Sequence, residues 1–532
     1  MKKLLVTLTL AIIALAGCGS ASDEGVVLKI ATPQIETLDV TLATYEQTFE
    51  VYASIYECLY TINETGEIVP AGAASMPVVS EDGLTYSIML NEDAIWADNT
   101  GEVQRNVVAN DYVVAWQRML DPEVGAAYSY IYDIIEGYEA ALAGDGDKLG
   151  IKAISDTELE ITLKHPAPHF TEMLVFYPFA PLAPELLNEA YGTTGESVWY
   201  NGPFYLDAYD NTGIINAVKS PGYWDVDNVE LDGVKYITMD EATTEFNAFQ
   251  AGEVDVSVIP GPEQLATANT DFPEHVVFKP SSGTMVLYQN TEGEYTSNVN
   301  FRKALQHAVN TTAIAQEIIG GGVLPATTFV PGELTEGSYG VNFKDLTGDL
   351  SSYDEVLAKE YLALATSEMG VSASDISIDL LVSSSVTSDL PAYLQSQLES
   401  ILGITVNIDS AEQNSFYDQV DNGFFDLCFS GWIADYGDAG SFLGLFKSMY
   451  IGGLNTSRYT NDEYDVAFDK ANQIVDGDER NAAFAALETH IVKDEAALIP
   501  LYHRGNNGLV RDTFNMPTHP FYIVSSKFIT TN

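Results

Sequence analysis

Two segments of this sequence have residues at spacings that could form a metal site or a phosphate-binding loop. His165 and His169 are four positions apart, as metal ligands on one face of a helix can be, but Pro166 and Pro168 lie between them and exclude a regular helix. We therefore expect a loop that packs apolar side chains. The glycine-rich run 144–150 lacks the G-x-G-x-x-G spacing, and its acidic residues would repel phosphate, so a surface turn is expected.

Enzyme signatures are absent from the sequence. It contains no G-x-S-x-G, H-E-x-x-H or G-x-x-x-x-G-K-[ST] motif. Acidic pairs such as Asp462 and Glu463 arise by chance in a chain with 77 acidic residues and do not identify a hydrolase. No C-x-x-C pair suggests a metal or redox site. We predict a protein that is not an enzyme and has no metal site or cofactor; a secreted hydrolase is the alternative from a different class.

The length of the chain limits the possible domain organisation, and its net charge limits the possible binding partners. A chain of 532 residues predicts more than one domain, or one large domain with insertions. Its formal net charge of −54 makes nucleic acid a very poor partner and disfavours adsorption to anionic lipid. A soluble, self-repelling surface is the simplest interpretation. Adaptation to salt and a preference for cationic ligands both remain open.

The first residues indicate where the protein is located. Lys2 and Lys3 precede an apolar run, 4–16, that is too short to span a bilayer stably. The run ends in L-A-G-C, which resembles the bacterial lipobox, so we expect a signal peptide at 1–17, a lipid on Cys18 and a polar tether at 18–25. A secretory signal without lipidation is the alternative. Cys58 and Cys428 are expected to be buried thiols, although a disulfide between them is not excluded.

The body of the chain alternates between strand-like and helix-like segments. Apolar alternation predicts strands at 84–90 and 159–163, and apolar segments indicate further strands at 27–30, 376–382, 404–408 and 424–429. Helical spacing of apolar residues predicts helices at 47–60, 111–120, 392–401, 463–475 and 480–492. This alternation favours βαβ units and an α/β fold.

Several segments, taken in order, resemble the oligopeptide-binding lipoproteins, the large peptide class of solute-binding proteins that serve ABC importers. They are 82–86, 111–122, 201–206, 221–224, 251–255, 301–305, 431–436 and 499–502. Each segment alone is weak, whereas the ordered set covers nearly the whole mature chain. The run W-I-A-D-Y at 432–436 is the element most specific to peptide binders.

The resemblance implies a two-lobed α/β fold, like the type II periplasmic binding proteins, with an extra domain inserted in the first lobe. The first lobe would comprise 26–62, 188–282 and 504–532, the extra domain 63–187 and the second lobe 283–503. The chain would cross between the lobes near Gly283 and His503.

The resemblance also implies a site between the lobes. Asp435 matches the family's aspartate that pairs with the α-ammonium of a peptide, and closure would shield that pair from water. The peptide backbone would lie extended along the protein main chain near Gly431. The other residues expected at the site are Trp432, Ala434, Tyr436, Tyr128 and Tyr502. Core packing is the alternative role for Trp432 and for the tyrosines at 128 and 502, and an exposed loop position is the alternative for Asp435.

Two departures concern the peptide's other end. Phe429 and Pro391 stand where a tripeptide-binding member has an arginine and a histidine for the C-terminal carboxylate, which favours longer peptides or a C-terminus held elsewhere. That member's cysteine pair is replaced by Gly283 and Ile433.

The function implied by the resemblance is capture of oligopeptides outside the cell by a lipid-anchored monomer. ABC permease subunits in the membrane would receive the peptide. The alternatives are the same fold with a dipeptide, nickel chelate, haem or sugar, and a receptor for signal peptides.

Overall fold

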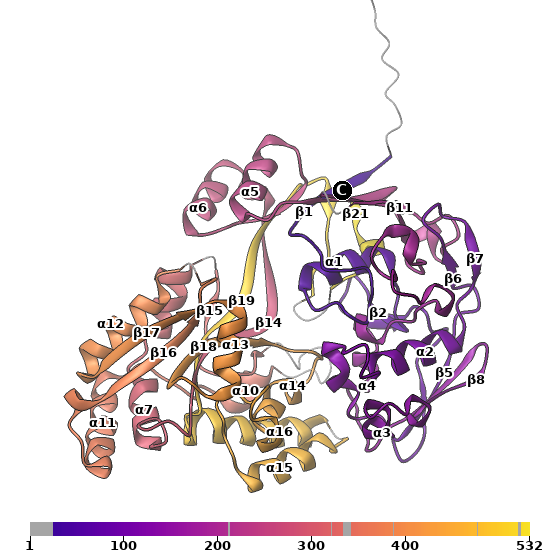
Figure 1. The fold of residues 1–532 in the computed structure, drawn as a ribbon. Coiled ribbons are helices and arrows are strands. Elements are labelled where there is room, and N and C mark those ends of the chain that lie inside the picture. Colours follow the sequence, from indigo (N-terminus) through magenta and orange to yellow (C-terminus); the bar gives the residue numbers. More distant parts are fainter. Residues whose placement is uncertain are drawn as a thin grey trace, which may run out of the picture.

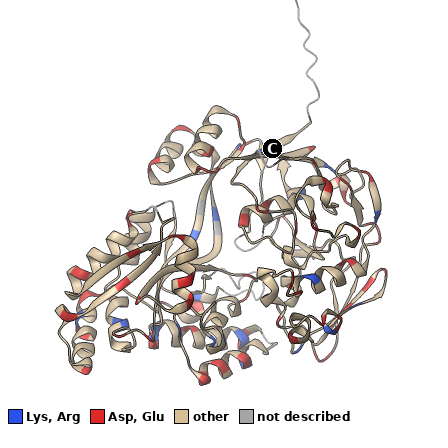
Figure 2. Ribbon diagram, viewed as in Figure 1, with Lys and Arg blue, Asp and Glu red and all other residues tan. Residues whose placement is uncertain are grey.

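The computed structural model describes residues 25–210, 213–320, 322–332, 342–386, 388–475, 477–519 and 523–532. The expected signal peptide, Cys18 and all of the expected tether except Gly25 lie outside these residues. Within the described part of the chain, no helix is both long and apolar enough to cross a membrane. Acidic residues are spread over the whole molecule in Figure 2, whereas basic residues are few.

One sheet of eleven strands runs through the molecule. Its order is β10 (Phe204–Asp210), β11 (Ile214–Lys219), β12 (Gly233–Thr238), β1 (Val27–Thr32), β13 (Val256–Val258), β19 (Leu498–Val510), β14 (Val276–Gln289), β18 (Leu427–Ile433), β16 (Ser377–Ser383) and β17 (Thr405–Ala411), and β15 (Leu324–Pro325) pairs with β19. Two long strands, β14 and β19, connect the part of the fold that carries β1 with the part that carries β16, β17 and β18 (Figure 1).

The pairing of β14 with β19 changes register near the middle of both strands. Pro280 pairs with Gly505, and the next pair is Thr284 with His503. Of the two expected crossings between lobes, Gly283 lies within this break and His503 borders it. The domain limits given above remain a prediction.

Local periodicity explains the elements beyond β14. Leu390, Leu394, Leu398 and Leu402 recur every four residues on α12 (Leu390–Leu402), and all four are buried. This helix joins β16 to β17, which run parallel. The strand–helix–strand unit predicted from the sequence is therefore present.

Residues from the expected extra domain form a separate antiparallel sheet. Its strand order is β4 (Val78–Val79), β5 (Thr85–Met89), β9 (Glu158–Thr162) and β8 (Ile151–Ser155). Every second residue of β5 and β9 is buried, as the alternating sequence predicts. Helix α2 (Ala109–Met119) buries Tyr112, Trp116 and Met119.

Several predicted boundaries differ from the structure. The helix expected at 47–60 is α1 (Glu46–Ile55); Tyr56 is already extended, and Tyr60 begins β2 (Tyr60–Ile62). The strand expected at 424–429 is β18, which starts three residues later and continues through Ile433. Phe424 is instead exposed after the glycine that ends α13 (Gln413–Asn422).

The two late helices also begin and end differently from the prediction. They are α15 (Asp462–Asn472) and α16 (Gly477–Glu488), and a π-helical turn at Thr489–Asp494 follows α16.

The two cysteines in the body of the chain, Cys58 and Cys428, are both free and buried. The disulfide that the sequence left open is therefore not formed in this structure.

Candidate functional site

Strand β18 leads directly into the segment that the sequence singled out. It pairs antiparallel with β14 along its whole length, from Leu427 opposite Gln289 to Ile433 opposite Gly283. On its other side it pairs with β16 only at Leu427 and Cys428, so no other described strand pairs with the rest of that edge. An extended chain could add to the sheet there.

Gly431 is needed where β18 and β14 approach each other. A Cβ atom at this position would lie 2.5 Å from Sδ of Met285 and 2.8 Å from the carbonyl oxygen of Thr284. The glycine therefore fits the close packing of the two strands. The positions of the family's cysteine pair, Gly283 and Ile433, lie directly opposite each other in the same ladder.

Asp435 is a partly buried carboxylate with a neutral hydrogen-bond donor. Tyr130 Oη donates to its Oδ2 at 3.0 Å, and the Asp435 backbone N–H donates to Ser441 Oγ at 2.8 Å. Burial raises the pKa of Asp435 to about 7, and the Tyr130 hydrogen bond only partly opposes this. Among the described residues, no basic side chain forms an ion pair with it. The site therefore favours a cation supplied by a ligand.

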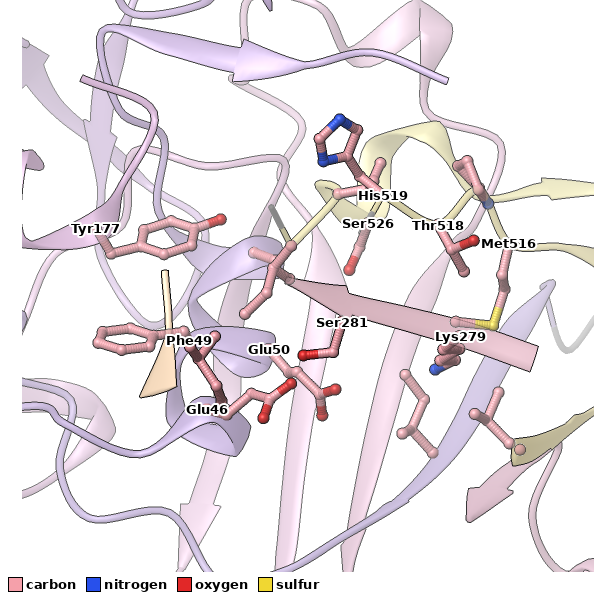
Figure 3. A pocket seen from close by; sticks show the side chains of 18 of the residues that line it. Glu46, Phe49, Glu50, Tyr177, Lys279, Ser281, Met516, Thr518, His519 and Ser526 are labelled. Atoms are coloured by element: carbon pink, nitrogen blue, oxygen red, sulfur yellow. The ribbon is translucent and has the colours of Figure 1, made fainter. Parts of the chain in front are cut away.

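Asp435 and Ala434 line a cavity with a volume of about 430 Å³. Figure 3 shows part of the wall of this cavity. Helix α1 supplies Glu46, Phe49 and Glu50, β14 supplies Lys279 and Ser281, and other chain segments supply Tyr128, Phe176 and Tyr177. The rings of Tyr128 and Phe176 meet edge to face, 5.1 Å apart. The lining thus combines aromatic and charged side chains.

Asp435 also lines a smaller cavity of about 130 Å³ beside the first. Trp432 and Tyr436 contribute to its wall, together with Tyr130 and His165. Asp435 is therefore placed where the two cavities adjoin.

A buried polar cluster lies next to the smaller cavity. Arg480 donates to both carboxylate oxygens of Asp438, at 2.7 and 3.0 Å, and both side chains are fully buried. Burial alone would raise the pKa of Asp438, but Arg480 holds it below its usual value. Arg480 also donates to His169 Nδ1 at 3.2 Å, and the His169 ring stacks on Tyr436 with centroids 4.6 Å apart. The cluster joins residues of the expected extra domain to residues of the expected second lobe.

His169 is therefore more than part of an apolar loop, as the sequence had suggested. It directly precedes a short helix, α4 (Phe170–Met173), and burial lowers its pKa to about 3, so the ring is neutral and can accept the hydrogen bond from Arg480. Arg480 and Asp438 were missed in the sequence because 42 positions separate them and neither belongs to a motif.

The structure brings most, though not all, of the predicted residues to the cavities. Tyr502 pairs with Met285 and Pro325 in the sheet and lines neither cavity. Phe429 is buried in the apolar core of this part of the fold. Pro391 lies in the first turn of α12. Neither of these two lines a cavity described above.

Comparisons with known proteins all find solute-binding proteins. The family model of the bacterial extracellular solute-binding proteins, family 5, matches residues 67–453. The oligopeptide-binding protein OppA of Bacillus subtilis is 31% identical over 467 residues, covering 85% of this chain and 82% of that protein. The dipeptide-binding protein of Lactococcus lactis is 28% identical over 506 residues, covering 91% and 89%. The structure of Listeria monocytogenes OppA bound to peptide superposes with a TM-score of 0.78 at 27% identity, over 96% of this chain and 99% of that one.

Proposed function

The chain belongs to family 5 of the bacterial extracellular solute-binding proteins, and we propose that it captures oligopeptides outside the cell and delivers them to an ABC importer. The environment of the Asp435 carboxylate is the observation that carries this proposal. Its carboxylate is desolvated, has no basic partner among the described residues, and lies where two cavities adjoin. The α-ammonium of a peptide supplies the missing charge.

The open edge of β18 supports an extended mode of binding. A peptide whose amine lies at Asp435 can continue along 429–432, where β18 pairs on one side only. Main-chain hydrogen bonds would then hold any sequence, and Trp432 and Tyr128 would wall the side-chain pockets. Tyr436 and Ala434 would position the aspartate between them, and Gly431 would keep the strand close to β14.

The remaining parts of the proposal concern location and assembly. A lipid on Cys18 would hold a monomer at the outer face of the cell membrane, with 18–25 as the tether. The lobes would have the limits given from the sequence and would close over the peptide. The family is one of solute-binding proteins, and we propose that the bound peptide is released intact rather than cleaved.

Mass spectrometry of the ligands that copurify tests this function. The protein without residues 1–18 is purified without denaturation, and small molecules are then released with acid. Peptides with free amino termini are the expected result, and added peptide should be recovered uncleaved. A metal chelate, haem or sugar in their place would retain the family and overturn the peptide assignment.

A further inference from the structure

The charges around the larger cavity do not balance. Three carboxylates line it, from Glu46, Glu50 and Asp435, whereas Lys279 is its one basic lining residue with a permanent charge. His519 also lines the cavity, but burial lowers its pKa to about 4, so it is neutral at pH 7. With all carboxylates ionised, the lining therefore carries a formal charge of −2.

Glu46 and Glu50 project together from one face of α1. They are four residues apart on this helix, which places both side chains on the same side, toward β14 and the cavity (Figure 3). Among the described residues, neither carboxylate forms an ion pair or a side-chain hydrogen bond. Two neighbouring carboxylates at a cavity wall repel each other unless a cation lies between them.

Lys279 does not remove this excess. Burial raises the pKa of Glu50 above its usual value, Lys279 opposes the shift, and Glu46 and Glu245 add to it. The shift remains upward because burial is its largest cause and Lys279 only partly opposes it. A further cation close to α1 would favour the ionised form.

We propose that this cavity selects peptides that carry a lysine or arginine side chain, which Glu46 and Glu50 bind while Asp435 holds the α-ammonium. The inference rests on the proposed function, because it specifies which peptides the same cavity accepts. An amino-terminal end with one basic side chain brings two positive charges to a lining of −2.

The same charges indicate where the peptide's carboxylate is not held. Lys279 shares the cavity with Glu46, Glu50 and Asp435, so a peptide carboxylate beside it would face a net negative lining. Phe429 and Pro391 provide no cation at the positions used by the tripeptide-binding member. The C-terminus therefore leaves the acidic cavity, which fits peptides longer than three residues.

Calorimetry with matched hexapeptides tests the proposal. Each peptide has a free amino terminus and an alanine background, and carries lysine, glutamine or glutamate at one position, moved in turn from the second to the sixth. At one position at least, we expect lysine to bind roughly ten- to a hundredfold more tightly than glutamine, as charge-assisted hydrogen bonds allow. Glutamate should bind more weakly than glutamine, and added salt should reduce the difference.

The variants separate this selection from the overall charge of the protein. Glu46→Gln combined with Glu50→Gln should bring the lysine-to-glutamine affinity ratio close to one. Glu196→Gln combined with Glu360→Gln removes the same charge at exposed sites outside the cavity and should retain the ratio. If the first pair fails to fold, Glu50→Gln alone should lower the ratio.

The outcomes distinguish the selection for basic side chains from peptide binding itself. Equal affinities for lysine and glutamine peptides, or a ratio unaffected by the variants at 46 and 50, would overturn the selection and leave peptide binding intact. If none of the hexapeptides binds, the proposed function itself fails, and the selection with it.

Discussion

Replacing Asp435 with asparagine tests the centre of the proposed site. The substitution keeps the shape of the side chain and its hydrogen-bond acceptor for Tyr130, and removes the charge that would pair with a peptide amine. Removing one partner of a buried ion pair costs about 3–5 kcal/mol. This corresponds to a loss of roughly two to nearly four orders of magnitude in affinity.

The raised pKa corrects this figure only slightly. With a pKa of about 7, half of the Asp435 carboxylates are protonated in the unliganded protein at pH 7. Only the ionised fraction binds an ammonium, so the apparent affinity of the unmodified protein is lowered by about twofold. The predicted loss remains about a hundredfold or more at pH 7.5.

The assay is calorimetry with a hexapeptide and its N-acetylated form. Acetylation should weaken binding to the unmodified protein about as much as Asp435→Asn does, and should weaken binding to the variant little further, because both changes remove the same pair. Asp271→Asn, at an exposed site that lines neither cavity, is the matched control. A Kd for the free-amine peptide within threefold of the unmodified protein would refute the reasoning.

Three further predictions follow from the buried groups. Peptide affinity should fall below pH 7, by up to tenfold per pH unit, because binding needs the Asp435 carboxylate to be ionised. Tyr130→Phe should move this decline to higher pH, because it removes a hydrogen bond that stabilises the ionised form. Calorimetry between pH 5.5 and 7.5 measures both effects, and the affinity of the N-acetylated peptide should not show the decline. Arg480→Met should lower the free energy of unfolding by about 3–5 kcal/mol in urea titrations, since it leaves a buried carboxylate unpaired, and an unchanged midpoint would contradict this. Cys58 and Cys428 should resist a thiol reagent in the native protein and should both react in guanidinium, because burial raises the pKa of each thiol; rapid native labelling would count against their burial.

Where apolar side chains recur at a regular spacing, the sequence was sufficient to predict the individual helix or strand. The leucine stripe of α12 and the alternation in β5 report burial directly, because each element buries one face. The end of α1 was wrong for a related reason: Leu59 is buried at a helical spacing but lies in the chain leading to β2. Burial alone does not distinguish a continued helix from an extended segment that covers the same core.

The candidate site was predictable only where a motif marked it. Asp435 and Trp432 belong to a contiguous run, and the structure places both at a cavity wall. Glu46, Glu50 and Lys279 reach the same cavity from two elements distant in sequence, and in so acidic a chain no glutamate stands out by type. Their relation depends on how the fold places α1 and β14 around one cavity.

Two hydrogen bonds beside the smaller cavity, Tyr130–Asp435 and Arg480–His169, would both affect ligand binding. Tyr130 comes from residues of the expected extra domain and Asp435 from those of the expected second lobe, so the hydrogen bond between them also joins these parts. His169 and Arg480 join the same two parts a short distance away. Bringing the parts together costs free energy at Asp435 as long as no cation is present, and an ammonium ion reverses the sign of that contribution. If the two parts close on a ligand as proposed, closure around a peptide amine would be favoured over closure around water, and the site would be selective before any side-chain pocket contributes.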